Sequence, residues 1–241
     1  METPQPLWNK RALLKDSTLV VCDLHIGLEE ELKKKGIFVS SGTPGMVGDI
    51  KDMLVEHETS CLIINGDLKH NIPQATWQEY REIPGVIDRW LRVTDEIHVI
   101  RGNHDGGVEE HLPGEVFIHD ARGYSRDGVG YFHGHARPSK EVLNSDVLVT
   151  AHSHPAVVLT DRLGKRNKFH CWSRIRYSGD EGEGYVIVMP AFNPLLGGVN
   201  INEEGYLGPF FRDTAILEEN IYLLDGTHLG DIRGKVCPEG A

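Results

Sequence analysis

The sequence predicts an α/β protein in which two β-sheets pack face to face with helices on the outside. In its first half, short apolar runs alternate with segments of helical character, which is the pattern of βαβ units and parallel strands. From residue 115 onward the helical signals become sparse and the apolar runs come closer together, which favours antiparallel pairing. A chain of 241 residues with 39% hydrophobic residues is long enough to bury one sizeable core. We therefore expect a single α/β domain.

Seven apolar runs are expected to form the strands of these sheets. They are rich in Val, Ile or Leu and fall near residues 18–22, 61–65, 96–100, 115–119, 129–133, 145–150 and 185–189. Turns between strands are expected at Asp127-Gly128, which is typical of a two-residue hairpin, and at Leu163-Gly164.

Three helices are expected between the early strands. Residues 27–35 are rich in Leu, Glu and Lys, and Thr43-Pro44 opens a helix over residues 46–56. Residues 74–91 place apolar side chains at spacings of three or four, and Pro84-Gly85 is expected to break or kink this helix. The last segment, residues 190–241, has short apolar clusters without clear chemistry. We expect it to cover the end of a domain that spans residues 1–241.

Composition bounds the class of protein. The charged fraction of 25% is ordinary for a globular domain. No run approaches the roughly 18 apolar residues that a transmembrane helix needs. The N-terminus lacks the apolar stretch of a secretory signal, so a cytoplasmic protein without membrane attachment is expected. The four cysteines show no CxxC spacing, which argues against a disulfide framework or a structural zinc site.

The charges of the sequence give arguments both against and for binding of nucleic acid. The net charge of −11 argues against whole-surface attraction to phosphate. One stretch is basic and is opposed only by Asp161: Arg162, Lys165, Arg166, Lys168, Arg174 and Arg176. It fits either a solvated hairpin or a surface that contacts a phosphate backbone beside a site.

Five short polar segments each follow an apolar run, where a strand would end. They are Asp23-Leu24-His25, Gly66-Asp67-Leu68-Lys69-His70, Gly102-Asn103-His104-Asp105, His133-Gly134-His135 and His152-Ser153-His154. The carboxyl ends of neighbouring buried strands are where an α/β sheet gathers its active site. One Asp-x-His segment alone would be an ordinary turn, whereas five in this order predict a shared site.

The chemistry of these side chains indicates metal ions. Carboxylate oxygens, one amide oxygen and several imidazoles suit Mn²⁺, Fe or Zn²⁺, and the absence of thiolates disfavours a soft-metal site. Seven plausible ligands are too many for one ion, so two divalent ions are expected, Mn²⁺ in preference to Fe or Zn²⁺. Two ions about 3.5–4 Å apart can hold phosphate oxygens and lower the pKa of a water between them. Asp67 is the natural bridge, because a carboxylate can bind through both oxygens.

The order D-x-H, G-D-x-x-H, G-N-H-D, H-G and H-x-H resembles the calcineurin-like metallophosphoesterase family. All five blocks are present in order from Asp23 to His154. The stretches DLHIGLEEEL and PAFNPLLGGVNIN look like the archaeal SbcD-related phosphoesterases, which are similar in turn to the ligase-associated bacterial phosphoesterases. The resemblance implies a four-layer αββα sandwich of two mixed sheets with flanking helices. Ala151 stands where the family usually has glycine, a departure that removes no ligand.

The resemblance also implies a role for each matched residue. One ion would be held by Asp23, His25 and His154, and the other by Asn103, His133 and His152, with Asp67 as the bridge. His104 would contact the phosphate and protonate the leaving oxygen, and Asp105 would orient His104.

Four residues near the motifs keep more than one interpretation. His133 and His135 compete for one ligand position, and His133 is preferred because it precedes glycine as in the family pattern. His70 is expected near the site, where it could contact substrate without binding metal. Arg101 would contact the substrate phosphate or form a surface salt bridge.

The expected activity is hydrolysis of a phosphoester with two divalent ions and no covalent intermediate. A phosphodiester of DNA or RNA is preferred, with a link to DNA repair, and Lys165, Arg166 and Lys168 would contact its backbone. One alternative is a small-molecule or nucleotide phosphodiesterase or phosphatase with a narrow pocket. Another is a non-catalytic scaffold on the same fold, as in the retromer subunit that resembles phosphoesterases. The scaffold is disfavoured because His104 and all seven ligands are present. No protein partner is predicted.

Overall fold

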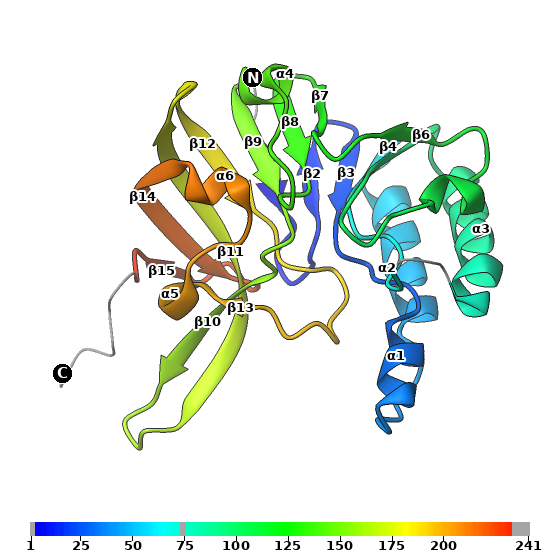
Figure 1. Ribbon diagram of the computed structural model, residues 1–241, viewed down its shortest axis with the longest axis horizontal. Helices are drawn as coiled ribbons and strands as arrows, with labels where there is room; N and C mark the ends of the chain where they lie inside the picture. Colours follow the sequence, from blue (N-terminus) through cyan, green and yellow to red (C-terminus); the bar gives the residue numbers. More distant parts are fainter. Residues whose placement is uncertain (1–2, 73–75, 233–241) are drawn as a thin grey trace.

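Two β-sheets lie face to face in the computed structural model, which describes residues 3–72 and 76–232 (Figure 1). Helices lie on the outer side of each sheet, so the predicted four-layer αββα sandwich in one domain is confirmed (Figure 1). None of the helices in these ranges is long and apolar enough to cross a membrane.

The first sheet carries the βαβ units predicted for the first half of the chain. Its strands are β1 (Gln5–Pro6), β2 (Leu13–Lys15), β3 (Thr18–Val21), β4 (Cys61–Asn65), β5 (Glu96–Ile100) and β6 (Phe117–His119), in that order across the sheet. The four strands β3 to β6 pair in parallel, and β1 and β2 extend the sheet in antiparallel pairs. The carboxyl ends of β3, β4 and β5 therefore lie at one edge of the sheet.

Helices connect these strands as predicted. They are α1 (Leu28–Lys34), α2 (Thr43–Glu56) and α3 (Trp77–Leu91), followed by a 3-10 turn at Val108–His111. The predicted break at Pro84-Gly85 is wrong, because α3 runs on through Pro84. Ile83, Val86 and Ile87 on either side of the proline are buried in the core, and this packing keeps the segment helical. The predicted start at Gln74 lies outside the described residues.

The second sheet is mixed. Its strands are β7 (Tyr124–Arg126), β8 (Val129–Phe132), β9 (Val147–Thr150), β10 (Pro155–Thr160), β11 (Arg166–Gly179), β12 (Gly182–Val188), β13 (Val199–Asn200), β14 (Thr214–Leu223) and β15 (His228–Gly230). β11 pairs antiparallel with β10, β12 and β14, as expected for the second half. β8, β9 and β12 pair in parallel, which the local strand pattern did not predict, although the resemblance implied a mixed sheet. Both predicted turns are present, at Asp127-Gly128 and around Gly164.

Short helices lie against the second sheet: α4 (Lys140–Leu143), α5 (Ile201–Glu204) and α6 (Pro209–Arg212). The last two belong to residues 190–232, which also supply β13, β14 and β15 to the sheet. β14 was not among the predicted strands, since Glu218, Glu219 and Asn220 interrupt its apolar pattern. Residues 233–241, including Cys237, lie outside the described residues.

Alternating side chains of the strands divide the core into layers. In β3, Leu19 and Val21 pack with the helices of the first sheet. Val20 and, after the strand, Cys22 pack between the two sheets, with Cys61 among their neighbours. Both thiols are fully buried and pack as small apolar groups. This inter-sheet layer ends at the edge where the polar segments begin.

Candidate metal centre

The predicted polar segments lie at the ends of strands from both sheets. Those after β3, β4 and β5 come from the first sheet, and those after β8 and β9 come from the second. Backbone hydrogen bonds join neighbouring loops: the N–H of Asp23 donates to the carbonyl of Gly66 at 3.0 Å, and that of His25 donates to the carbonyl of Asp67 at 2.9 Å. The structure therefore gathers the segments where the two sheets meet.

Five of the predicted ligands have a left-handed backbone. Their φ angles are 52° for Asp23, 44° for His25, 53° for Asp67, 62° for His152 and 43° for His154. Nine non-glycine residues with positive φ occur in the described chain, so predicted ligands make up more than half of them. Such conformations cost on the order of 1–3 kcal/mol each and persist where the surroundings impose them, often at functional sites. The left-handed conformations are therefore concentrated in the loops that carry the predicted ligands.

Two glycines allow the loops to approach one another. A Cβ at Gly66 would lie 2.2 Å from Nδ1 of His133, and Gly66 itself has a φ of 89°. A Cβ at Gly102 would lie 2.1 Å from Oδ1 of Asp67. The glycines of the G-D and G-N blocks are thus required by close packing against a predicted ligand.

One group of potential ligands joins the first and second sheets. It consists of Asp23, His25 and His154, whose ligand atoms all lie within 4.8 Å of one another. Nε2 of His154 lies 3.0 Å from Oδ1 of Asp23. This is the set that the resemblance assigns to one ion.

A second group consists of Asp67, His133 and His152, again with ligand atoms within 4.8 Å of one another. Oδ2 of Asp67 lies 3.2 Å from Nε2 of His133 and 3.3 Å from Nε2 of His25. One carboxylate oxygen therefore faces an imidazole of each group. This is the position that a bridging carboxylate would need.

Several atoms of these groups are buried without a hydrogen bond. Among the described residues, no partner is found for either carboxylate oxygen of Asp23 or for Nε2 of His25, His133 and His154. A buried carboxylate is costly unless a charge or a hydrogen bond compensates it. Divalent cations would compensate these oxygens and accept the imidazole lone pairs. The donor set of carboxylate oxygens and imidazole nitrogens thus fits Mn²⁺, Fe or Zn²⁺.

His133 shows which ring nitrogen would be a ligand. Its Nδ1 lies 3.0 Å from the carbonyl oxygen of Asn65, and because a carbonyl only accepts, Nδ1 must donate. Nε2, which faces Asp67, is therefore the nitrogen that could bind an ion after it loses its proton. Burial alone would lower the pKa of His133, but the carboxylates of Asp67 and Asp23 outweigh it and raise that pKa to about 9. The site thus has a strong affinity for positive charge.

Asn103 and His152 lie at the outer side of the centre. Asn103 is exposed, in a turn whose flanking residues are tied to the centre: the N–H of His104 donates to Oδ1 of Asp67 at 2.8 Å. His152 is half-buried and burial lowers its pKa to about 4, as it does for His135. The ring of His135 lies 5.3 Å from that of His133. The assignment of Asn103 as a ligand stays a prediction.

The predicted contact between Asp105 and His104 is replaced by a different arrangement. Oδ2 of Asp105 accepts from the N–H groups of Asp67 and Gly102, both at 2.8 Å, and Oδ1 accepts from that of Lys69 at 3.2 Å. Nδ1 of His104 is hydrogen-bonded to the carbonyl oxygen of His70. Asp105 therefore fixes the loops that carry Asp67 and His104, and the His70 carbonyl orients the His104 ring. Burial and the charge of Asp67 raise the pKa of Asp105 to about 6.

His70 and Arg101 have different surroundings. His70 is buried, and its Nδ1 lies 3.0 Å from Nδ1 of His25. Arg101 is half-buried and pairs with Glu109 at 2.9 Å, which is the salt bridge that the sequence left open. His70 is therefore part of the centre, whereas Arg101 lies at its margin.

The basic stretch forms the β10–β11 hairpin, which projects from the body of the molecule (Figure 1). Lys165, at its tip, is exposed. Arg166 holds Glu203 through contacts of 2.5 and 2.7 Å, and Lys168 donates to the carbonyl of Gly198 at 2.6 Å. The six residues of β10 begin directly after His154 and extend roughly 20 Å at about 3.3 Å per residue. The hairpin tip thus lies well away from the ligand loops.

Two supporting residues were not predicted from the sequence. Asn193 is buried, donates through Nδ2 to the carbonyl of Leu24 at 2.9 Å, and accepts at Oδ1 from the N–H of Leu195. The hydroxyl of Ser153 accepts from the N–H of Leu207 at 3.0 Å. Asn193 follows the apolar run of β12, so the strand-end signal could have indicated it. Ser153 carries no comparable signal apart from its place between two predicted ligands.

Solved structures share this architecture. The nuclease MPE of Pseudomonas putida has a TM-score of 0.60 at 19% sequence identity, with 95% of this chain and 100% of that chain covered. The phosphoesterase YfcE of E. coli has a TM-score of 0.45 at 16% identity, with 90% and 98% covered. The likeness to the nuclease shows the fold, which is the calcineurin-like phosphoesterase fold that the motifs imply. No family model and no curated protein matches the chain.

Proposed function

We propose that this protein is a divalent-metal-dependent phosphoesterase that hydrolyses phosphodiester bonds. One observation carries the proposal: Oδ2 of Asp67 faces an imidazole of each of two groups of potential ligands, and each group keeps its ligand atoms within 4.8 Å of one another. Among the described residues, the buried Nε2 atoms of His25, His133 and His154 and both carboxylate oxygens of Asp23 have no hydrogen-bond partner. Such a site binds cations, and two cations side by side are suited to a phosphoryl group.

The proposed ligands are those of the two groups, with Asn103 added from the resemblance. Asp23, His25 and His154 would hold one ion, Asn103, His133 and His152 the other, and Asp67 both. Bound divalent ions would polarise the phosphoryl oxygens and make a water acidic enough to attack phosphorus. The chain contributes fixed ligand loops, so little reorganisation is needed when substrate binds.

His104 is proposed to act on the leaving oxygen. Because its Nδ1 donates to the His70 carbonyl, Nε2 is the nitrogen left for substrate. Its backbone N–H holds Oδ1 of Asp67, so the ring is fixed relative to the proposed bridge. A protonated Nε2 could donate its proton to the departing alkoxide, which is general acid catalysis.

Nucleic acid is the proposed substrate class. Support comes from the shared fold with a nuclease, from the two SbcD-like stretches of sequence, and from the basic β10–β11 hairpin. The net charge of −11 opposes the proposal, although bound cations would offset part of it. A strand several nucleotides long could contact the hairpin while one phosphate lies at the centre.

The test is a comparison of three substrates with Mn²⁺ on one sample: a bis-aryl phosphate, an aryl monophosphate and single-stranded DNA. We expect Mn²⁺-dependent cleavage of the diester and of DNA, because both are phosphodiesters that react by in-line displacement at phosphorus, with an aryl oxide leaving from the first and a sugar alkoxide from the second. Turnover of the monoester alone would contradict the nuclease assignment. Absence of turnover on all three, together with absence of Mn²⁺ binding, would contradict the phosphoesterase assignment.

A small-molecule phosphodiesterase is the second candidate. It is favoured by the ion pairs of two arginines that were expected to contact substrate phosphate. Arg101 and Arg166 are each already paired with a carboxylate of the chain. Efficient cleavage of the bis-aryl phosphate or a cyclic nucleotide, without cleavage of DNA, would identify this activity.

A further inference from the structure

The ring of His70 lies between a predicted ligand and a surface carboxylate. Its Nδ1 lies 3.0 Å from Nδ1 of His25, and its Nε2 lies 2.5 Å from Oε2 of Glu31. Glu31 is on α1, the helix that begins just after His25, and its other oxygen is bonded to Lys35. A continuous hydrogen-bonded chain thus runs from Glu31 through His70 to His25.

The backbone of His70 is held as firmly as its ring. The buried carboxylate of Glu79 accepts from the N–H groups of His70 and Asn71, both at 2.8 Å, and also caps the start of α3 together with Thr76. The carbonyl of His70 orients His104. His70 therefore contacts the predicted ligand His25 with its side chain and the proposed acid His104 with its backbone.

The direction of these hydrogen bonds follows from the chemistry of the groups. An ionised carboxylate only accepts, so Nε2 of His70 must donate to Glu31. Neutral His70 then has a lone pair on Nδ1, and Nδ1 of His25 must donate to it. The remaining nitrogen of His25, Nε2, is consequently left with its lone pair directed to the buried region beside Asp67, 3.3 Å away.

We propose that Glu31, acting through His70, is a positioning residue that keeps His25 in the tautomer able to bind a metal ion at Nε2. The inference rests on the proposed function, because it takes His25 as a ligand. It adds a residue outside all five sequence motifs. A carboxylate behind a ligating imidazole fixes its tautomer and orientation, here with a second imidazole in between.

Loss of the carboxylate would remove the constraint on His70. Nδ1 of His70 could then carry the proton and donate to Nδ1 of His25, which would move the His25 proton to Nε2. The atom that should face the ion would be blocked by that proton. Only the group of Asp23, His25 and His154 would be affected directly, since Nδ1 of His133 is fixed independently by the carbonyl of Asn65.

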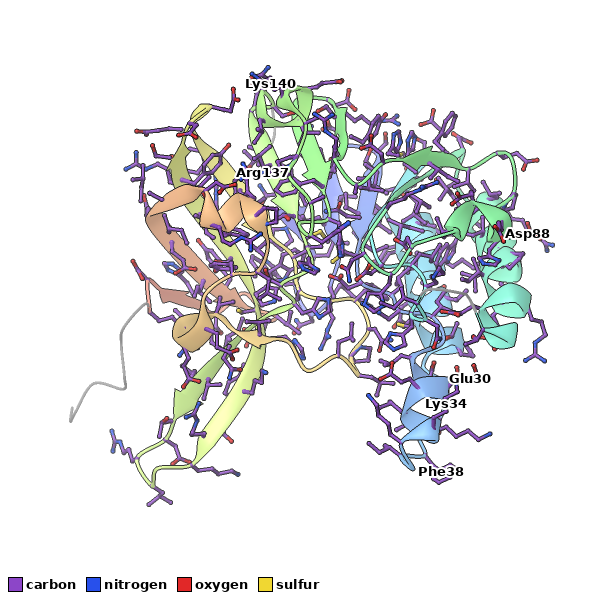
Figure 2. The ribbon with its side chains drawn as sticks, viewed as in Figure 1. Glu30, Lys34, Phe38, Asp88, Arg137 and Lys140 are labelled. Carbon is purple, nitrogen blue, oxygen red and sulfur yellow. The ribbon has the colours of Figure 1, made fainter. Side chains whose placement is uncertain are left out.

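The experiment measures Mn²⁺ binding to the full chain by calorimetry without substrate, for wild type and for Glu31→Ala, Glu31→Gln and Glu30→Ala. Glu30 is the matched control: it neighbours Glu31 on α1, which projects from the body of the protein, and its loss changes net charge equally (Figure 2). We expect Glu31→Ala to weaken one of two Mn²⁺ sites by about 10- to 100-fold. Glu31→Gln retains an acceptor oxygen and should weaken it less, and Glu30→Ala should match wild type.

Two further measurements separate positioning from simple destabilisation. The thermal midpoint of the metal-free protein should be the same for Glu31→Ala and Glu30→Ala, and imidazole ¹⁵N shifts should show a changed tautomer at His25 and His70 only in the former. Equal Mn²⁺ affinity of these two variants, or unchanged tautomers, would overturn the inference. If wild type itself bound no Mn²⁺, the proposed function would fail instead, so the two failures are distinguishable.

Discussion

The ligand loops and the β10–β11 hairpin are both polar regions for which the sequence predicts a function, but their charged side chains differ in burial and in the partners that they have within the protein. At the loops, Asp23 is fully buried and neither of its carboxylate oxygens has a hydrogen-bond partner among the described residues. At the hairpin, Arg166 is exposed and makes a two-contact ion pair with Glu203. The carboxylate of Asp23 faces only imidazole nitrogens, those of His154 at 3.0 Å and His133 at 3.8 Å, whereas the guanidinium of Arg166 is paired with a carboxylate.

This difference in burial and partners indicates which of the two regions would gain more stability from a bound ligand. A buried carboxylate that faces only imidazoles would be stabilised further by a bound cation, which supports the proposal that the ligand loops bind cations. An exposed ion pair contributes only about 0–1 kcal/mol and is easily exchanged for another anion. The hairpin can therefore release its cations to a phosphate backbone or keep them paired. The chemistry of the reaction is specified much more tightly than the substrate.

Removal of divalent ions should give the largest effect. We expect a chelator to abolish hydrolysis of a bis-aryl phosphate and Mn²⁺ to restore it, because the imidazoles that face the buried carboxylates cannot activate a water as a divalent ion does. At 100 times its dissociation constant, an ion adds about 2.7 kcal/mol to the free energy of unfolding, so the thermal midpoint should fall on chelation. Turnover that persists in chelator would show that the centre works without ions.

Substitution of the proposed bridge comes next. Asp67→Asn keeps the shape of the side chain but removes the charge that faces His25 and His133. We expect the rate with Mn²⁺ to fall by about 10²- to 10³-fold, the range for loss of a group that stabilises transition-state charge. Both Mn²⁺ sites should weaken together in calorimetry. Weakening of only one site would assign Asp67 to a single ion.

The strand-end pattern was sufficient to predict which side chains lie together, because its information is local. An apolar run followed by Asp or His fixes both the strand and the side chain at its end, so Asp23, Asp67 and His133 could be placed from the sequence. The partners that orient them come from elsewhere in the chain. Asn65 acts through a backbone carbonyl, which has no sequence signature, and Glu31 acts from a helix surface within the stretch DLHIGLEEEL, where nothing in the sequence distinguishes it from Glu29 and Glu30.

The same limit explains where the observed structure differs from what the local sequence pattern predicts. The parallel pairing of β8, β9 and β12 depends on the order of strands in the folded sheet, which short-range patterns do not encode. α3 continues through Pro84 because buried neighbours stabilise it, a tertiary effect that outweighs the local preference. The contact expected between Asp105 and His104 failed similarly, since three backbone amides compete for that carboxylate.

A glycine substitution should test how tightly the centre is packed. Gly102→Ala would place a methyl group 2.1 Å from Oδ1 of Asp67. We expect the overpacking to lower the free energy of unfolding by about 1–3 kcal/mol, and to lower the Mn²⁺ affinity because the carboxylate of Asp67 moves. The control is Gly85→Ala in α3, where a Cβ meets no atom within 4 Å. That variant should gain about 0.5–1 kcal/mol by helix propensity, with unchanged Mn²⁺ affinity. Equal metal affinity in the two variants would contradict tight packing at the centre.

The smallest effect is expected at the hairpin, where it decides the substrate. The triple variant Lys165→Gln, Arg166→Gln and Lys168→Gln should leave bis-aryl phosphate turnover unchanged, since the hairpin tip lies roughly 20 Å along β10 from His154. If DNA crosses the hairpin, the KM for DNA should rise in the triple variant. The slope of log K for DNA binding against log salt concentration should also become shallower by about 2, the value for three lost phosphate contacts. Lys140→Gln is the control: Lys140 is an exposed residue of α4 that pairs with Glu181 (Figure 2). An unchanged salt dependence in the triple variant would mean that the paired cations stay with their carboxylates, which favours a small phosphodiester as the substrate.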